Sequence, residues 1–158
     1  MASEAATRTD AQTGMALDWW QAGIVGGVVG GVVFGVMMTM EMRMVMEMAI
    51  PGMYGLSPGL ELGWVIHLFH SAVFGVVFAA AVRYAGGTDR LDSNLTVAVA
   101  GLAYGLIVWV LAASILMPAW VNVTMGMGAP VPDFVLASAI GHAVYGVLLG
   151  IVYAVLAG

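Results

Sequence analysis

The chain has 158 residues, of which 62% are hydrophobic and only 8% are charged. A soluble domain carries about 25% charged residues, so this composition excludes an ordinary soluble enzyme and a disordered chain. The four basic residues are all Arg and are too few for a basic patch, which excludes a nucleic-acid-binding protein. Without Cys, disulfides and thiolate metal sites are excluded as well. The composition indicates a small integral membrane protein.

Four apolar segments are long enough to cross a bilayer as helices. A membrane helix needs roughly 20 apolar residues, and these runs are continuous, without the alternation of a β-barrel strand. Breaks rich in Pro and Gly separate them. We expect an all-α integral membrane four-helix bundle over residues 19–158 and a flexible polar tail over residues 1–18. The helices are expected at about 20–49, 61–84, 95–120 and 134–157.

Three Arg indicate how the bundle lies in the membrane. Arg8 precedes the first helix, and Arg83 and Arg90 flank the connection between the second and third. These regions share one side of the membrane when four helices alternate in direction. By the positive-inside rule, we expect a multi-pass protein of the cell membrane with both termini in the cytoplasm.

The two halves of the chain resemble each other. Residues 31–35, GVVFG, align with residues 101–105, GLAYG, and residues 72–76, AVFGV, align with residues 143–147, AVYGV. Each half is then a helical hairpin of the same design, and both hairpins insert in the same orientation. The sequence predicts a bundle of two parallel-repeat helical hairpins, related by a pseudo-twofold axis along the membrane normal.

Glycines recur every four residues on the first, third and fourth predicted helices. Small residues at this spacing let helix backbones approach closely. One interpretation is helix packing within the bundle, and the other is a docking face for a second copy or another subunit. The glycines concerned are Gly23, Gly27, Gly31, Gly35, Gly101, Gly105, Gly146 and Gly150.

Three motifs stand out in the apolar part of the chain: MAIPGMYGL at residues 48–56, GWVIHLFH at residues 63–70 and GHAVYG at residues 141–146. Together they resemble a family of small four-helix membrane proteins from halophilic archaea. The lack of Lys and the acidic balance also fit a high-salt proteome. Because the family is of unknown function, the resemblance implies a fold and no activity. Some members are labelled histidine kinase, but this sequence has no Gly-rich nucleotide box to support that label.

The three His are candidates for a cofactor site, because ionisable residues at membrane depth are costly and often functional. His70 and His142 each lie nine residues after an acidic residue at a helix start, about 13 Å into the membrane. Two His at one depth on facing helices can hold a b-type haem, with His67 in reserve. The glycines that would leave room for the ring are Gly63, Gly75, Gly141 and Gly146.

Other interpretations of these His stay open. Neutral imidazoles can hydrogen-bond between helices and hold them together. They can also contact a quinone or bind a different metal, for which His67 and His70, three residues apart, would combine with His142. No carboxylate is expected at that depth, which argues against a zinc hydrolase.

The end of the first helix is rich in Met. Thioethers are soft ligands that suit Cu(I), so a Met-lined site is a further candidate. The copper hypothesis uses Met40, Met44 and Met48, which follow one face of the helix. The alternative is that flexible Met side chains fill irregular gaps in the packing. A second set, on nearly the opposite face of the helix from Met40, Met44 and Met48, consists of Met38, Met42 and Met46.

A charge cluster, Glu41, Arg43 and Glu47, lies among these Met. By length, the first helix has crossed the bilayer by residue 40, which puts the charges at the outer interface. By the repeat, Glu41 and Arg43 align with the interior of the third helix and would be buried. Because Arg43 and Glu47 are four residues apart, we expect them to form an ion pair, at the interface or facing the bundle.

The sequence contains no nucleophile–base pair, phosphate loop or metalloprotease motif, so we expect a non-catalytic protein. The first hypothesis is a structural or accessory subunit of a homo-oligomer or a larger complex in the lipid bilayer. The second is an electron-transfer subunit that carries haem b. The third is a Met-lined transporter for Cu(I) or another small solute.

Overall fold

The computed structural model describes residues 17–86 and 93–157. In this part of the chain four helices are long and apolar enough to cross a membrane. They are α1 (Trp19–Glu41), α3 (Leu60–Tyr84), the helical run Asn94–Met125 and α6 (Leu136–Leu156). These residues contain no strand. The expected all-α four-helix membrane bundle is confirmed, and the protein is a multi-pass membrane protein. The expected tail lies outside the described residues up to residue 16.

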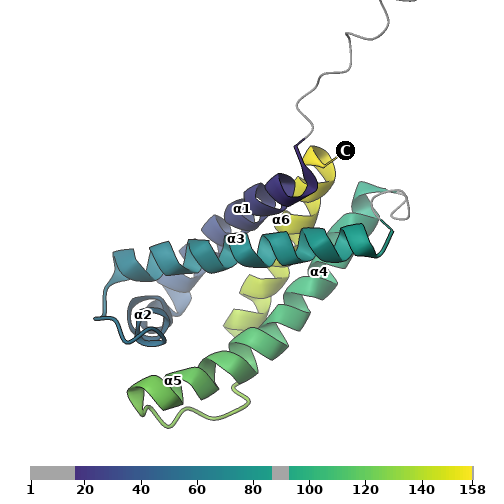
Figure 1. The fold of residues 1–158 in the computed structure, drawn as a ribbon. Helices are drawn as coiled ribbons and strands as arrows, with labels where there is room; N and C mark the ends of the chain where they lie inside the picture. The colour runs from purple at the N-terminus through teal and green to yellow at the C-terminus, as the bar shows by residue number, and fades with distance from the viewer. Residues whose placement is uncertain (1–16, 87–92, 158) are drawn as a thin grey trace, which may run out of the picture.

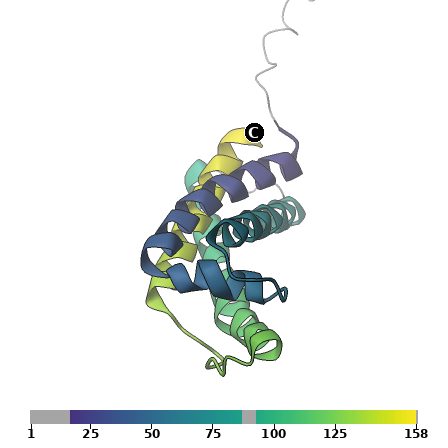
Figure 2. The same ribbon diagram turned by 90° about the vertical axis from the view of Figure 1, so that its left-hand side faces the viewer.

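Two helices form the centre of the bundle and two flank them. α1 packs on α3, α6 packs on α4 (Asn94–Val108), and α1 and α6 pack on each other. The start of α1 and the end of α6 lie together at one end, where the Leu17 N–H donates to the Leu156 carbonyl at 2.9 Å (Figure 1). The opposite end holds α2 (Ile50–Gly52) and α5 (Met117–Met125) (Figures 1 and 2). We call these ends the terminal end and the loop end.

Glycines let the helices touch backbone to backbone toward the terminal end. A Cβ on Gly75 of α3 would meet the carbonyl oxygen of Gly23 on α1. In the second hairpin, a Cβ on Gly146 of α6 would meet the carbonyl oxygen of Gly101 on α4. Contacts of this kind supply the van der Waals attraction that replaces the hydrophobic effect between helices in lipid.

α1 uses glycines on two of its faces. Besides the face toward α3, it presents Gly30, whose added Cβ would lie 2.8 Å from the Tyr145 carbonyl oxygen of α6. The central helix therefore touches both of its neighbours closely. All eight glycines of the predicted pattern lie against another helix of the same chain. They are Gly23, Gly27, Gly31, Gly35, Gly101, Gly105, Gly146 and Gly150.

The two hairpins share this contact, but in a register different from the sequence alignment. Gly75 meets Gly23, and its counterpart Gly146 meets Gly101. The contacts therefore equate Gly23 with Gly101, whereas the alignment equated Gly31 with Gly101. The difference is eight residues, or about two helical turns. Short apolar motifs fix such a register weakly, because Gly and Val recur throughout α1.

Pro51 shapes the loop that joins α1 to α3. Proline has no N–H, so the carbonyl four residues before it loses its helical donor. Here that carbonyl belongs to Glu47, within the π-helical turn η1 (Val45–Ala49). It accepts the N–H of Gly59 at 2.9 Å instead, which ties the returning loop to the helix that it leaves.

Pro118 has the same effect in the second hairpin. It follows the π-helical segment η3 (Trp109–Leu116) and deprives the Ser114 carbonyl of its helical donor. That carbonyl accepts the N–H of Asp133 at 2.8 Å, from the loop between α5 and α6. We call these two hydrogen bonds the loop clips. They fix both loops of the loop end against the membrane helices.

The first membrane helix ends earlier than the sequence predicted. A single helix was expected over residues 20–49, but α1 ends at Glu41 and the backbone breaks at Met42, with φ −137° and ψ 42°. The 23 residues of α1 already span about 34 Å, which suffices for the hydrocarbon core. The third helix runs to Met125 rather than 120, where Gly126 caps it in the left-handed conformation. The other boundaries differ from the prediction by at most two residues.

Candidate functional site

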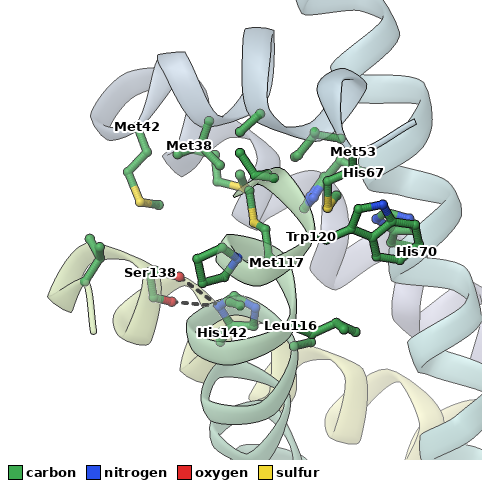
Figure 3. A pocket seen from close by; sticks show the side chains of 18 of the residues that line it. Met38, Met42, Met53, His67, His70, Leu116, Met117, Trp120, Ser138 and His142 are labelled. Carbon is green, nitrogen blue, oxygen red and sulfur yellow. Dashed lines mark hydrogen bonds between the residues drawn. The ribbon is translucent and has the colours of Figure 1, made fainter. Parts of the chain in front are cut away.

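The loop end of the bundle encloses a cavity of about 450 Å³. Its walls come from η1, α2, α3, η3, α5 and the parts of α1, α4 and α6 nearest the loop end, and from the loop before α6. All three His of the chain line it, with five of the thirteen Met (Figure 3). Those five are Met38, Met42, Met53, Met117 and Met127. We call this space the histidine cavity.

The histidine cavity is confined to the loop half of the bundle. Toward the terminal end its lining stops at Phe34 on α1, Phe74 on α3, Val108 on α4 and Tyr145 on α6. Beyond these residues the helices are in glycine contact. Toward the loop end the lining includes Asp133 in the last loop. Within residues 17–86 and 93–157, one copy of the chain therefore forms a one-sided cavity rather than a continuous pore.

His142 on α6 has one ring nitrogen that is hydrogen-bonded and one without a partner in the described part of the chain. Its Nδ1 lies 2.8 Å from the Ser138 carbonyl oxygen and 3.4 Å from the Ser138 Oγ (Figure 3). A carbonyl only accepts, so Nδ1 carries the proton and donates it. In the neutral ring Nε2 then bears a lone pair, and it makes no hydrogen bond with the described residues. Metal-binding His residues are oriented in this way, by a carbonyl on their second nitrogen.

His67 on α3 holds two helices together. It is only 7% exposed, and its Nε2 donates to the Gly31 carbonyl of α1 at 2.9 Å. The Ser71 hydroxyl donates to the His67 carbonyl at 2.8 Å within α3. His67 thus makes the interhelical hydrogen bond that one interpretation of the sequence proposed.

His70 lies at the surface edge of the cavity. Its Nε2 is hydrogen-bonded to the Tyr54 hydroxyl, and the Tyr54 ring packs on Trp120 with 5.8 Å between ring centroids. Tyr54 and Trp120 are 45% and 40% exposed. The cluster of these three side chains joins the end of α2, α3 and α5 across the rim of the cavity.

The two His predicted as haem ligands line the same cavity, but each imidazole has another side chain beside it. His70 is paired with Tyr54, and the imidazole opposite His142 is that of His67. Between these two rings stands Phe34, whose ring centroid lies 4.7 Å from that of His142 and 5.5 Å from that of His67. Both contacts are of the edge type, so an aromatic side chain lies between His142 and His67, the ligand held in reserve.

The glycines that were expected to make room for a haem ring are filled by other parts of the protein. Gly141 faces the Phe34 ring, and Gly63 faces the Met46 carbonyl. Gly75 and Gly146 face carbonyls of the neighbouring helices, as described above. The described residues therefore do not fit a haem between α3 and α6.

The Met residues that line the cavity are not the stripe predicted to bind copper. Met40 and Met44 are 76% and 67% exposed and face away from the bundle, and Met48 does not line the cavity. Met38 and Met42, on nearly the opposite face, do line it. Because the helix is apolar on every side, hydropathy does not indicate which face turns inward.

The charge cluster lies at the loop end, outside the cavity. Arg43 Nε and Glu47 Oε2 are 3.1 Å apart on the surface, so the expected ion pair is confirmed. Glu41 is exposed as well. The acidic residue that lines the cavity is Asp133, whose carboxylate makes no hydrogen bond or ion pair with the described residues.

Sequence reasoning missed several residues of the cavity, chiefly Phe34, Tyr54, Met117 and Asp133. They come from the ends of helices and from loops that meet only in three dimensions. The sequence signal that could have indicated this arrangement is Pro118. It leaves the Ser114 carbonyl without a helical donor, and the Asp133 N–H takes that place and brings the loop before α6 to the end of η3.

Comparison with family models, with curated proteins and with solved structures finds no match to this chain. The resemblance to membrane proteins of halophilic archaea therefore stays a prediction. The candidate function rests on the histidine cavity alone.

Proposed function

We propose that this chain is a non-catalytic membrane protein that binds a small ligand in the histidine cavity. The supporting observation is that all three His and five Met, from segments far apart in the sequence, line one cavity. Ionisable side chains at membrane depth are costly, so their convergence supports a functional site. A volume of about 450 Å³ lies in the range of small-molecule sites, roughly 300–1,000 Å³.

We place the cavity on the outer side of the cell membrane, with both termini in the cytoplasm. Arg83 supports this orientation, because it lies at the terminal end with its guanidinium carbon 5.6 Å from the Trp19 ring centroid. Trp marks a membrane interface, and Arg is enriched at the cytoplasmic one. Arg8 and Arg90, which the orientation also uses, lie outside the described residues.

Binding fits the shape of the bundle better than conduction. The glycine contacts close the terminal half, so a solute that enters the cavity does not pass through one copy of the chain. The same glycines are engaged within the chain. An accessory role in a homo-oligomer or a larger complex would therefore use a different surface for the contact between subunits.

A single introduced Cys tests access to the cavity, because the chain has no thiol of its own. Ala113→Cys places a thiol on the cavity wall, and Ala103→Cys places one on the exposed side of α4 as a matched control. In right-side-out membrane vesicles, a charged methanethiosulfonate added outside should label the first thiol and leave the second, which faces lipid, unlabelled.

One result would overturn the proposed function, and another would overturn the proposed orientation. If Ala113→Cys were unreactive from both sides, the cavity would be closed to solutes. If it reacted only with reagent enclosed in the vesicle, the cavity would face the cytoplasm and the proposed orientation would be wrong.

A further inference from the structure

We propose that the histidine cavity binds one Cu(I) ion, with Met38, Met117 and His142 as its ligands. The inference rests on the proposed function, since it names the ligand of the same cavity. The ion is bound and released as Cu(I), so the step involves no electron transfer.

The three ligands come from three helices and meet in the same cavity. Met38 on α1 is 5% exposed, Met117 is the first residue of α5, and His142 lies on α6. Figure 3 shows their side chains reaching into the cavity from different walls. The donors are two thioethers and the lone pair of an imidazole whose other nitrogen is held by Ser138. Soft thioethers with imidazole select Cu(I) among the biological metals.

The donor set argues against other common metals. Among the described residues, no group of three or more His, Cys, Asp or Glu is placed to hold a metal ion. Zn²⁺ sites are built from such residues, and Ca²⁺ and Mg²⁺ require several oxygen ligands. Thioether sulfur, by contrast, is the most abundant donor type in this cavity.

Asp133 provides a negative charge that can compensate the positive charge of Cu(I). Thioethers and neutral imidazole leave the single positive charge of Cu(I) uncompensated, which is costly away from water. Asp133 lines the same cavity, and its carboxylate has no partner among the described residues. One monovalent cation would therefore balance it, whereas a divalent cation would leave a net charge.

The mouth of the cavity offers a further thioether for the ion to pass along. Met127 lies in the loop before α6, lines the cavity and is 53% exposed. Met42 and Met53 also line the walls. We infer that Cu(I) enters from the loop end by exchange between thioethers.

Competition for Cu(I) tests the site. The full chain in detergent micelles is titrated anaerobically with Cu(I) buffered by bicinchoninate, and we expect one bound ion. Met38→Leu and Met117→Leu conserve volume, so they should leave the fold intact. They should weaken Cu(I) binding about tenfold or more, as loss of a metal-site group does. X-ray absorption of the wild-type complex should show Cu–S scattering that diminishes in both variants.

Two exposed Met near Met38 in the sequence provide the matched control. Met40→Leu and Met44→Leu remove thioethers outside the cavity and should leave Cu(I) binding unchanged. Equal losses in both pairs of variants would place the metal on the surface and overturn the proposal. So would a failure of the wild-type protein to compete with bicinchoninate. If Ala113→Cys is labelled from outside while Cu(I) does not bind, the copper assignment is wrong and the ligand-binding function stands. If Ala113→Cys is not labelled and Cu(I) does not bind, both the ligand-binding function and the copper assignment are wrong.

Discussion

Replacing Gly75 by Ala tests whether contact between backbones holds α1 against α3. The new Cβ would meet the Gly23 carbonyl oxygen and would lie 2.9 Å from the Gly27 Cα. Carbon atoms pack at about 3.5–4.0 Å, so the two helices would have to part by roughly 0.6 Å or more. A gap of that size forfeits about a quarter of the contact energy of the atoms that face it. In lipid, packing of this kind is the main attraction between helices.

We expect Gly75→Ala to lower the free energy of unfolding by about 1–2 kcal/mol. Overpacking costs about 1–3 kcal/mol, and the better helix propensity of Ala returns up to about 1 kcal/mol. Gly146→Ala should have a similar effect, since its Cβ would meet the Gly101 carbonyl oxygen in the same way.

The assay is unfolding by SDS in mixed micelles, followed by circular dichroism and Trp fluorescence. The matched control is Gly59→Ala, where the nearest atom to the added Cβ is the Leu62 Cβ at 3.8 Å and the backbone is extended with φ 178°. This variant should stay within about 0.5 kcal/mol of wild type. If Gly75→Ala were as stable as the control, close backbone approach would not be what these glycines provide.

Three further predictions follow from the contacts of α5 and α6. Tyr145→Phe removes a hydroxyl that donates to the Ser71 carbonyl at 2.8 Å, and it should cost about 1 kcal/mol in the SDS assay; an unchanged midpoint would count against this bond. Pro118→Ala restores an N–H that competes with the Asp133 N–H for the Ser114 carbonyl. The Asp133 amide should therefore exchange with deuterium faster, while the amides of α4 stay protected. Protein purified from a haem-replete host should show no Soret band, because aromatic and backbone atoms fill the expected gap; a Soret band that His142→Ala abolishes would contradict this.

The sequence predicted the membrane spans well because their information is local. About 20 apolar residues between Pro and Gly breaks suffice to place a helix, and each expected span has its counterpart in the structure. The glycines also carried information about rotation, since a small residue marks the side where another backbone approaches. Gly23 and Gly75 meet for this reason.

The inward face of the Met-rich segment could not be predicted in the same way. In a soluble helix the apolar face turns inward, but a membrane helix has apolar residues on all sides. Met38 and Met40 therefore look alike in the sequence, although one is buried and the other is 76% exposed. The pairing of His142 with Phe34 was out of reach for a similar reason, because it depends on how far α1 and α6 are rotated toward each other.

The loop clip at Ser114 has a consequence for the order in which the protein enters the membrane. The residue is completely buried within the third membrane-spanning run, and an unpaired carbonyl in hydrocarbon costs several kcal/mol. The donor that satisfies this carbonyl is synthesised only 19 residues later, at Asp133. Until that segment has left the ribosome and folded back, the third helix holds an open acceptor. The third membrane helix therefore reaches its stable state in the bilayer only after the loop that precedes α6 has folded back onto it.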